Sequence, residues 1–271
     1  MSNSCLPPEI LDLIVDLLHD DPNALKGSCL VSKSWIPRTR RHLFAKVGLR
    51  REKNLRSWKK LFSDPSTSPA RFAKSLQVGC ARAVTAADAE VGGWLTGFAH
   101  IVHLDLETQE IFPGEFNTYP RQKAISLVPF HGFSAAIKSL RVNTAELSPS
   151  RIFDFVFSSP LLEDLTVSGY STWVDDGDGS DSPPTFVQPS NPPVLTGSLG
   201  LSLVAGIEPV VRRLLSIPGG IHFRKLTLTW HREEGLPSII ALVGECSHTL
   251  ESLNVTCYLG GTSIRYLRPR S

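Results

Sequence analysis

The segments IKSLRV (residues 137–142) and LEDLTV (residues 162–167) share the pattern apolar-x-x-Leu-x-apolar. The pattern returns at residues 73–78, 101–106, 223–228 and 250–255, and in a weaker form at 196–201. Apolar residues that alternate with polar ones in such short runs predict β-strands with one buried face. The central leucines lie 25 to 36 residues apart, and they are Leu76, Leu104, Leu140, Leu165, Leu199, Leu226 and Leu253.

Helical patterns lie between several of these predicted strands. Ser148-Pro149, Glu208-Pro209 and Pro237 each precede apolar residues at helical spacing, and proline is favoured in the first turn of a helix. Strands and helices therefore alternate, and the connections are long enough for parallel strands. The sequence predicts an α/β fold.

The repeated segments resemble irregular leucine-rich repeats, whose units span roughly 20–29 residues. The resemblance implies a curved solenoid with a parallel sheet on its concave face. The repeats lack the fixed Asn or Cys usual in such units, because Asn143 and Asn254 do not share a position. A non-repeating α/β domain is the alternative.

The segment from Leu6 to Phe44 carries more large apolar residues than so short a piece can bury by itself. Pro7 and Pro8 predict the start of a helix that runs to about His19, with an apolar arc of roughly 200°. A second short helix is expected from Pro22 to Lys26, followed by an apolar group of Leu30, Val31, Trp35 and Ile36. The surplus apolar surface indicates a partner.

LPPEIL (residues 6–11), CLVSKSW (29–35) and RRHLF (40–44) resemble an F-box of the kind abundant in mushroom-forming fungi. An F-box is often followed by leucine-rich repeats. The resemblance implies docking to the Skp adaptor, and through it to cullin, by Leu6, Pro7, Ile10, Leu11, Ile14, Leu30, Val31 and Trp35. Pro37 departs from the pattern and is expected to kink or end the third helix. The alternative is a small helical cap on the following domain.

Three regions are expected on this basis. They are a three-helix F-box at residues 1–48, a helical and basic linker at 49–70, and a repeat domain at 71–271 with an exposed Pro- and Asp-rich insertion at about 171–194. Side chains that alternate with the buried leucines should face the concave surface. The predicted target-binding residues are Gln77, Asp105, Arg141, Thr166, Thr227 and Asn254.

No catalytic residue, cofactor site or metal site is predicted. The five cysteines are scattered, no GxSxG, P-loop or GxGxxG motif occurs, and the acidic run at residues 175–181 fails as an EF-hand loop. The basic stretch between Lys33 and Lys60 could bind phosphate, but a solvated face is favoured. With a net charge of +2 and no apolar run long enough to span a membrane, the sequence indicates neither a nucleic-acid nor a membrane partner.

These features together predict a non-catalytic subunit of a Skp/cullin/F-box ubiquitin ligase. Its F-box would dock to the Skp adaptor and its repeats would bind a target protein, in the cytoplasm or nucleus. The alternative is a leucine-rich-repeat scaffold whose F-box does not assemble a ligase. An enzyme is a distant third, because the sequence offers no candidate active site.

Overall fold

The computed structural model describes residues 7–90, 93–107, 127–143, 146–147, 149–169, 172–173, 193–204, 206–230, 235–259 and 262–267. Leu6 and most of the predicted insertion at 171–194 lie outside these ranges. Within the described residues no helix is long and apolar enough to cross a membrane.

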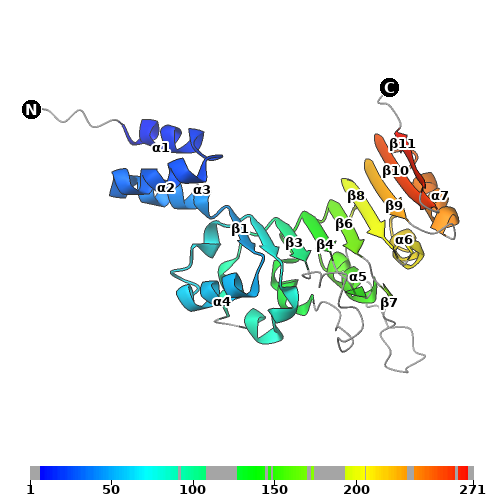
Figure 1. Ribbon diagram of the computed structural model, residues 1–271, viewed down its shortest axis with the longest axis horizontal. Coiled ribbons are helices and arrows are strands. Elements are labelled where there is room, and N and C mark those ends of the chain that lie inside the picture. Colours follow the sequence, from blue (N-terminus) through cyan, green and yellow to red (C-terminus); the bar gives the residue numbers. More distant parts are fainter. Residues whose placement is uncertain are drawn as a thin grey trace, which may run out of the picture.

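A single large sheet of nine described strands runs through the molecule, in the order β1-β2-β3-β4-β6-β8-β9-β10-β11 (Figure 1). The first eight of these strands are parallel and β11 is antiparallel to β10. The predicted α/β class with a parallel sheet is therefore confirmed. The strands are β1 (Lys46–Leu49), β2 (Ser75–Val78), β3 (His103–Glu107), β4 (Ser139–Asn143), β6 (Asp164–Gly169), β8 (Ser198–Leu203), β9 (Lys225–Trp230), β10 (Ser252–Leu259) and β11 (Thr262–Leu267).

The central leucines of the repeated pattern pair with one another across the sheet. Leu76 lies beside Leu104, Leu104 beside Leu140, and the same register continues through Leu165, Leu199, Leu226 and Leu253. All except Leu253 are buried. The apolar residues two positions later, from Val78 to Val255, form a second buried row. Both rows belong to one continuous core.

Helices α4 to α7 lie along one face of the sheet (Figure 1). Three of them begin at the predicted prolines, because a proline in the first turn requires no backbone N–H. Their apolar residues, such as Phe153, Val211 and Leu242, are buried against the strands. The four helices are α4 (Glu52–Leu61), α5 (Pro149–Phe157), α6 (Glu208–Leu215) and α7 (Leu236–Glu245).

Short 3-10 helices and a second pair of strands complete the connections. Strands β5 (Glu146–Leu147) and β7 (Thr172–Trp173) form a separate parallel pair. The 3-10 helices are η1 (Lys33–Trp35), η2 (Pro69–Phe72), η3 (Ala81–Ala83), η4 (Ala86–Ala89), η5 (Trp94–Gly97) and η6 (Val128–Phe133).

Three helices precede the sheet: α1 (Pro8–Leu17), α2 (Pro22–Val31) and α3 (Ile36–Leu43). We call residues 7–44 the N-terminal helical unit. Helix α2 runs five residues beyond the expected end at Lys26. The expected effect of Pro37 is wrong, since Pro37 lies in the first turn of α3 and opens the helix.

Two parts of the sheet differ from the expectations. Strand β1 was not predicted, and the boundary expected between residues 48 and 49 falls inside it. Strand β11 follows the last repeat and was not predicted. Helix α4 lies within the predicted linker, and its Leu55 and Trp58 are part of the same core as the strands.

The buried leucine row should carry much of the stability of the sheet. We expect Leu165→Ala, at a fully buried position, to lower the free energy of unfolding by about 2–5 kcal/mol, because it leaves a cavity. The measurement is urea denaturation followed by circular dichroism. Leu161→Ala is the matched control at a half-exposed leucine, where a change within about 0.5 kcal/mol is expected. Equal effects of the two substitutions would contradict the register assignment.

Candidate functional site

The N-terminal helical unit leaves large apolar side chains in contact with solvent. On α1, Ile10, Leu13 and Leu17 follow one helical stripe and are 43%, 55% and 75% exposed. At the end of α2, Leu30 is 89% exposed and Val31 is 69% exposed. Several large exposed apolar side chains on one small unit are typical of protein–protein contacts. We call these five residues the apolar surface of the unit.

The predicted adaptor-binding residues divide into three groups. Ile10, Leu30 and Val31 belong to the apolar surface, and Pro7 is exposed as the N-cap of α1. Leu11, Ile14 and Trp35 are only partly exposed. Leu6 lies outside the described residues. Leu13 and Leu17 were absent from the predicted set, although their places in the apolar arc of α1 could have revealed them.

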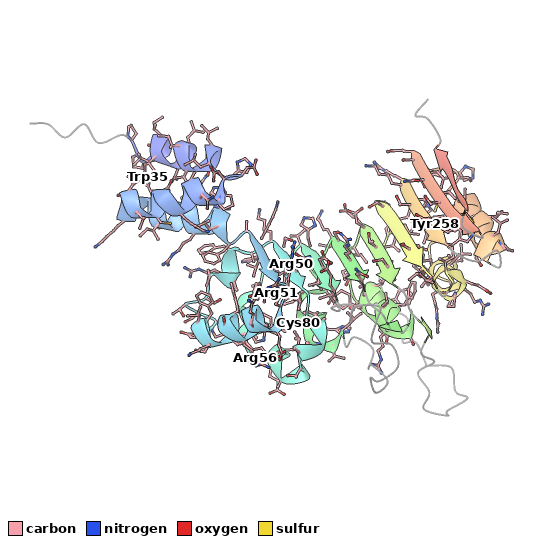
Figure 2. All side chains as sticks on the ribbon, viewed as in Figure 1. Trp35, Arg50, Arg51, Arg56, Cys80 and Tyr258 are labelled. Carbon is pink, nitrogen blue, oxygen red and sulfur yellow. The ribbon has the colours of Figure 1, made fainter. Side chains whose placement is uncertain are left out.

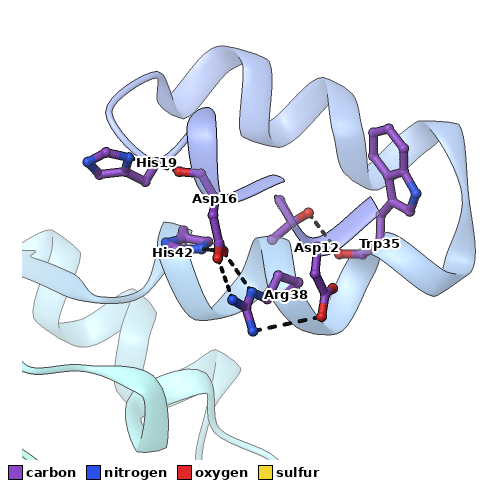
Figure 3. Close-up of polar contacts among 7 residues, drawn as sticks. Asp12, Asp16, His19, Trp35, Arg38 and His42 are labelled. Carbon is purple, nitrogen blue, oxygen red and sulfur yellow. Dashed lines mark hydrogen bonds and ion pairs between the residues drawn. The ribbon is translucent and has the colours of Figure 1, made fainter. Parts of the chain in front are cut away.

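An ionic cluster joins α1 to α3 (Figure 3). The Asp16 carboxylate accepts a hydrogen bond from Arg38 Nε at 2.7 Å and another from Arg38 Nη2. His42 Nε2 lies 2.7 Å from the same carboxylate, and Asp12 lies 3.8 Å from Arg38. In Figure 3, Trp35 lies on the opposite side of the unit from His19 and His42. The cluster therefore fixes the crossing of α1 and α3.

The helical unit is also attached to the sheet through its last helix. Helix α3 packs on η2, and Phe44 makes an edge contact with Trp58 of α4 at a ring-centroid distance of 6.3 Å. The backbone N–H groups of Lys74 and Ser75 donate to the Ala45 carbonyl oxygen. These contacts hold the apolar surface in a defined position relative to the sheet.

The predicted target-binding residues form one row on the opposite face of the sheet from α4 to α7. Gln77 pairs with Asp105, Asp105 with Arg141, and Arg141 with Thr166. The row continues through Gly200, Thr227 and Asn254. Gly200 was not predicted, and a Cβ there would lie 3.1 Å from the Thr166 side chain. The structure thus places all six predicted residues in one row across the sheet, with Gln77 and Asn254 far apart at its ends.

A hydrogen-bonded network covers the first three strands of this face. Arg50, which follows β1 and is labelled in Figure 2, donates from Nε to Gln77 Oε1 at 2.9 Å. Gln77 Nε2 donates to Asp105 Oδ2 and Glu107 Oε1, each at 3.3 Å. Sequence reasoning missed Arg50 and Glu107. Glu107 could have been found because it is the next outward position of β3 after Asp105.

The second carboxylate oxygen of Asp105, Oδ1, is covered and has no hydrogen-bond partner. Burial and the neighbouring Glu107 raise the pKa of Asp105, although Arg141 and Arg50 act in the opposite direction. The ionised form of Asp105 therefore destabilises the folded protein when no partner is bound.

Asp88 shows how this protein satisfies a buried carboxylate elsewhere. Its oxygens accept from the Thr85 N–H, the Trp94 indole N–H and Lys59 Nζ, each at 2.7 Å. Burial raises the pKa of Asp88, but the hydrogen bonds from Lys59, Thr85 and Trp94 outweigh it and lower the pKa overall. Asp105 lacks donors of this kind.

The described residues contain no group of three or more His, Cys, Asp or Glu side chains that could hold a metal ion. Comparisons with protein-family models, with curated proteins and with solved structures find no match for this chain.

We expect the Asp16 cluster to make stability depend on acid pH. Hydrogen bonds from Arg38 and His42 lower the pKa of Asp16 well below its ordinary value of 3.8. Because the folded pKa is depressed, the stabilisation is full above that ordinary value and is lost as pH falls below it. The difference in melting temperature between the parent protein and Asp16→Asn should be largest near neutral pH and shrink in acid. Asp12→Asn, which removes a longer contact to the same arginine, should change the melting temperature less at every pH.

We expect Asp105→Asn to stabilise the free protein at neutral pH. The pKa of Asp105 is raised, so its ionised form opposes folding once the pH exceeds that pKa. A neutral side chain of the same shape removes this effect, and the melting temperature should rise by roughly 1–3 °C. Differential scanning calorimetry measures the change. Asp88→Asn is the matched control and should lower the melting temperature, since Asp88 is fully hydrogen-bonded.

Proposed function

We propose that this protein is the substrate-recognition subunit of a Skp/cullin/F-box ubiquitin ligase, acting in the cytoplasm or nucleus. In this proposal residues 7–44 form the F-box and dock to the Skp adaptor. The repeat region from residue 71 onwards is a curved leucine-rich-repeat solenoid whose polar sheet face binds the target. The subunit contributes no catalytic group.

The observation that carries the proposal is the apolar surface of the N-terminal helical unit. Fully exposing a leucine to water costs about 1.5–3 kcal/mol relative to burial, and Leu30 is 89% exposed. The unit buries Val15 and Leu25 but leaves Leu17, Leu30 and Val31 in solvent. An F-box needs such residues for the adaptor, whereas a helical cap would turn them toward its own domain.

The in-register leucine row supports the assignment of the remainder to leucine-rich repeats. Each repeat contributes one strand beside the strand of the preceding repeat, so the outward residues of successive strands form continuous rows. A protein target can lie across such rows, since it meets mixed polar side chains rather than a single charge. This agrees with the composition of the row from Gln77 to Asn254.

The contacts among α3, η2 and α4 hold the apolar surface of the unit in a defined position relative to the polar face of the sheet. A receptor acts by proximity, because holding the target near the ubiquitin-conjugating enzyme raises the effective concentration of the target lysine. A stiff joint between adaptor and target surfaces favours that role. Phe44 against Trp58, together with the Ala45 hydrogen bonds, provides such a joint.

We expect Leu30→Asp to weaken binding to a purified Skp adaptor by at least about 2 kcal/mol, as for a central interface residue. Ile10→Asp should have a similar effect. Leu61→Asp is the matched control, because Leu61 is a leucine of α4 that is 72% exposed and lies outside the unit. Co-purification and isothermal titration calorimetry provide the measurement. Adaptor binding that is absent in the parent protein, or that survives Leu30→Asp and Ile10→Asp, would leave a repeat-based binding scaffold as the better account.

A further inference from the structure

Helix α7 turns an uncharged face toward solvent. Its exposed residues before Glu245 are Leu236, Pro237, Ile240, Ala241 and Gly244. Leu236 is 48% exposed and Ile240 is 64% exposed. A helix that is apolar on nearly every side is usually buried on every side. We call these five residues the outer α7 face.

The two preceding helices along the sheet present charged residues instead. Arg151 and Asp154 are exposed on α5, and Glu208 and Arg212 form an exposed ion pair on α6. Helix α6 packs on α5, and α7 packs on α6. In the described part of the chain after α7 there are two strands, β10 and β11, and no further helix. The outer α7 face therefore lies at the end of the row of helices (Figure 1), where a repeat array normally needs a polar covering.

The outer α7 face is complementary in shape to a second copy of itself. In an antiparallel pair of α7 helices whose two-fold axis passes between residues 240 and 241, Ile240 faces Ala241 of the other copy. The same symmetry places Pro237 opposite Gly244 of the other copy. Each larger side chain thus meets a small residue. A Cβ built on Gly244 would meet no neighbouring group within 4 Å, so the space beside it is open to a second helix.

The two ends of α7 are complementary in charge in this same arrangement. The axis places Glu245, the last residue of α7, beside Leu236 at the start of α7 in the other copy. Gly235 is the N-cap there and supplies no side-chain hydrogen bond. The unpaired N–H groups and the dipole of a helix N-terminus favour a carboxylate. The pair would therefore gain this contact twice, and no like charges face each other along the outer α7 face.

From these two kinds of complementarity we propose that the protein forms a two-fold dimer through the outer α7 face. Such a contact is self-complementary and closed, so it stops at two copies. One helix from each copy contributes, so the buried area is expected to be below the roughly 1,200 Å² of a stable interface, and the dissociation constant should be about 10–100 µM. The proposal is independent of the proposed function.

The dimer would leave the two candidate functional surfaces free. Helix α7 lies at the opposite end of the molecule from the N-terminal helical unit (Figure 1), and the polar row lies on the other face of the sheet. A pair of copies would therefore present two polar sheet faces. A target with two matching segments would bind such a pair more tightly than a single copy, because the second contact forms at a high effective concentration.

Sedimentation velocity of the full-length chain, from about 2 to 200 µM, tests the proposal, and the parent should change from monomer to mainly dimer over this range. Ile240→Glu puts a charge at the centre of the contact and should weaken the dimer by at least about tenfold. Gly244→Gln fills the open space and should have a similar effect. Glu245→Gln should weaken the dimer by about twofold to fivefold, because it removes a charge from each helix N-terminus.

The matched control is Gly27→Gln. Gly27 is also an exposed glycine within a helix, and a Cβ built on it would likewise meet no neighbouring group within 4 Å. This variant should dimerise as the parent does, and so should Leu30→Asp, which is directed at adaptor docking. Circular dichroism should show all these variants folded, because each changes an exposed side chain.

Two results would overturn the proposal, whatever the outcome for the adaptor. One is a parent chain that stays monomeric at the highest concentration. The other is a dimer that survives both Ile240→Glu and Gly244→Gln, since the two copies would then meet through a different surface.

Discussion

The pairing of one leucine with the next across the sheet is the constraint on which the rest of this structure depends. Each repeat must bring its leucine to the same height, because the buried face packs on one core to which α4 to α7 and the 3-10 helices η5 and η6 all contribute. The number of residues between successive central leucines therefore varies only in the connections between the strands. Since alternate residues of a strand face opposite ways, the buried register also determines the outward row. The composition of the outward row is thus a geometric consequence of the core.

How well each element could be predicted follows from the strength of its pattern. The repeated strands and α5 to α7 were accessible because leucine spacing and proline at helix starts are local signals. Strand β1 has four residues and lacks the full repeat pattern, and its place in the sheet depends on pairing with β2. Helix α2 continues past Lys26 to Val31, and the Ser28 hydroxyl donates to the Ala24 carbonyl oxygen within it. Pro37 could not be placed without knowing where α3 begins.

The strength of the local pattern also explains which residues of the outward sheet face could be predicted from the sequence. Gln77, Asp105 and Arg141 follow from alternation alone, because each sits between two buried residues of its strand. Arg50 could not be assigned to this face while β1 was unknown. Glu107 lies beyond the six-residue repeat, so a prediction limited to that pattern stopped one outward position too soon. The missing donor to Asp105 depends on side-chain geometry and has no signature in the sequence.

The two candidate surfaces share one physical property, which is that each is unfavourable in the free chain. Leu30 and Val31 remain in water although Val15 and Leu25 of the same unit are buried. Asp105 lacks a hydrogen bond to one oxygen, although Asp88 shows that this fold can surround a carboxylate with three donors. Exposed apolar residues also occur outside the unit, as Leu61 does at 72%, so the apolar surface is distinguished by several such residues on one small unit. Under the proposed function, adaptor binding would supply the apolar contact that Leu30 and Val31 lack in the free chain.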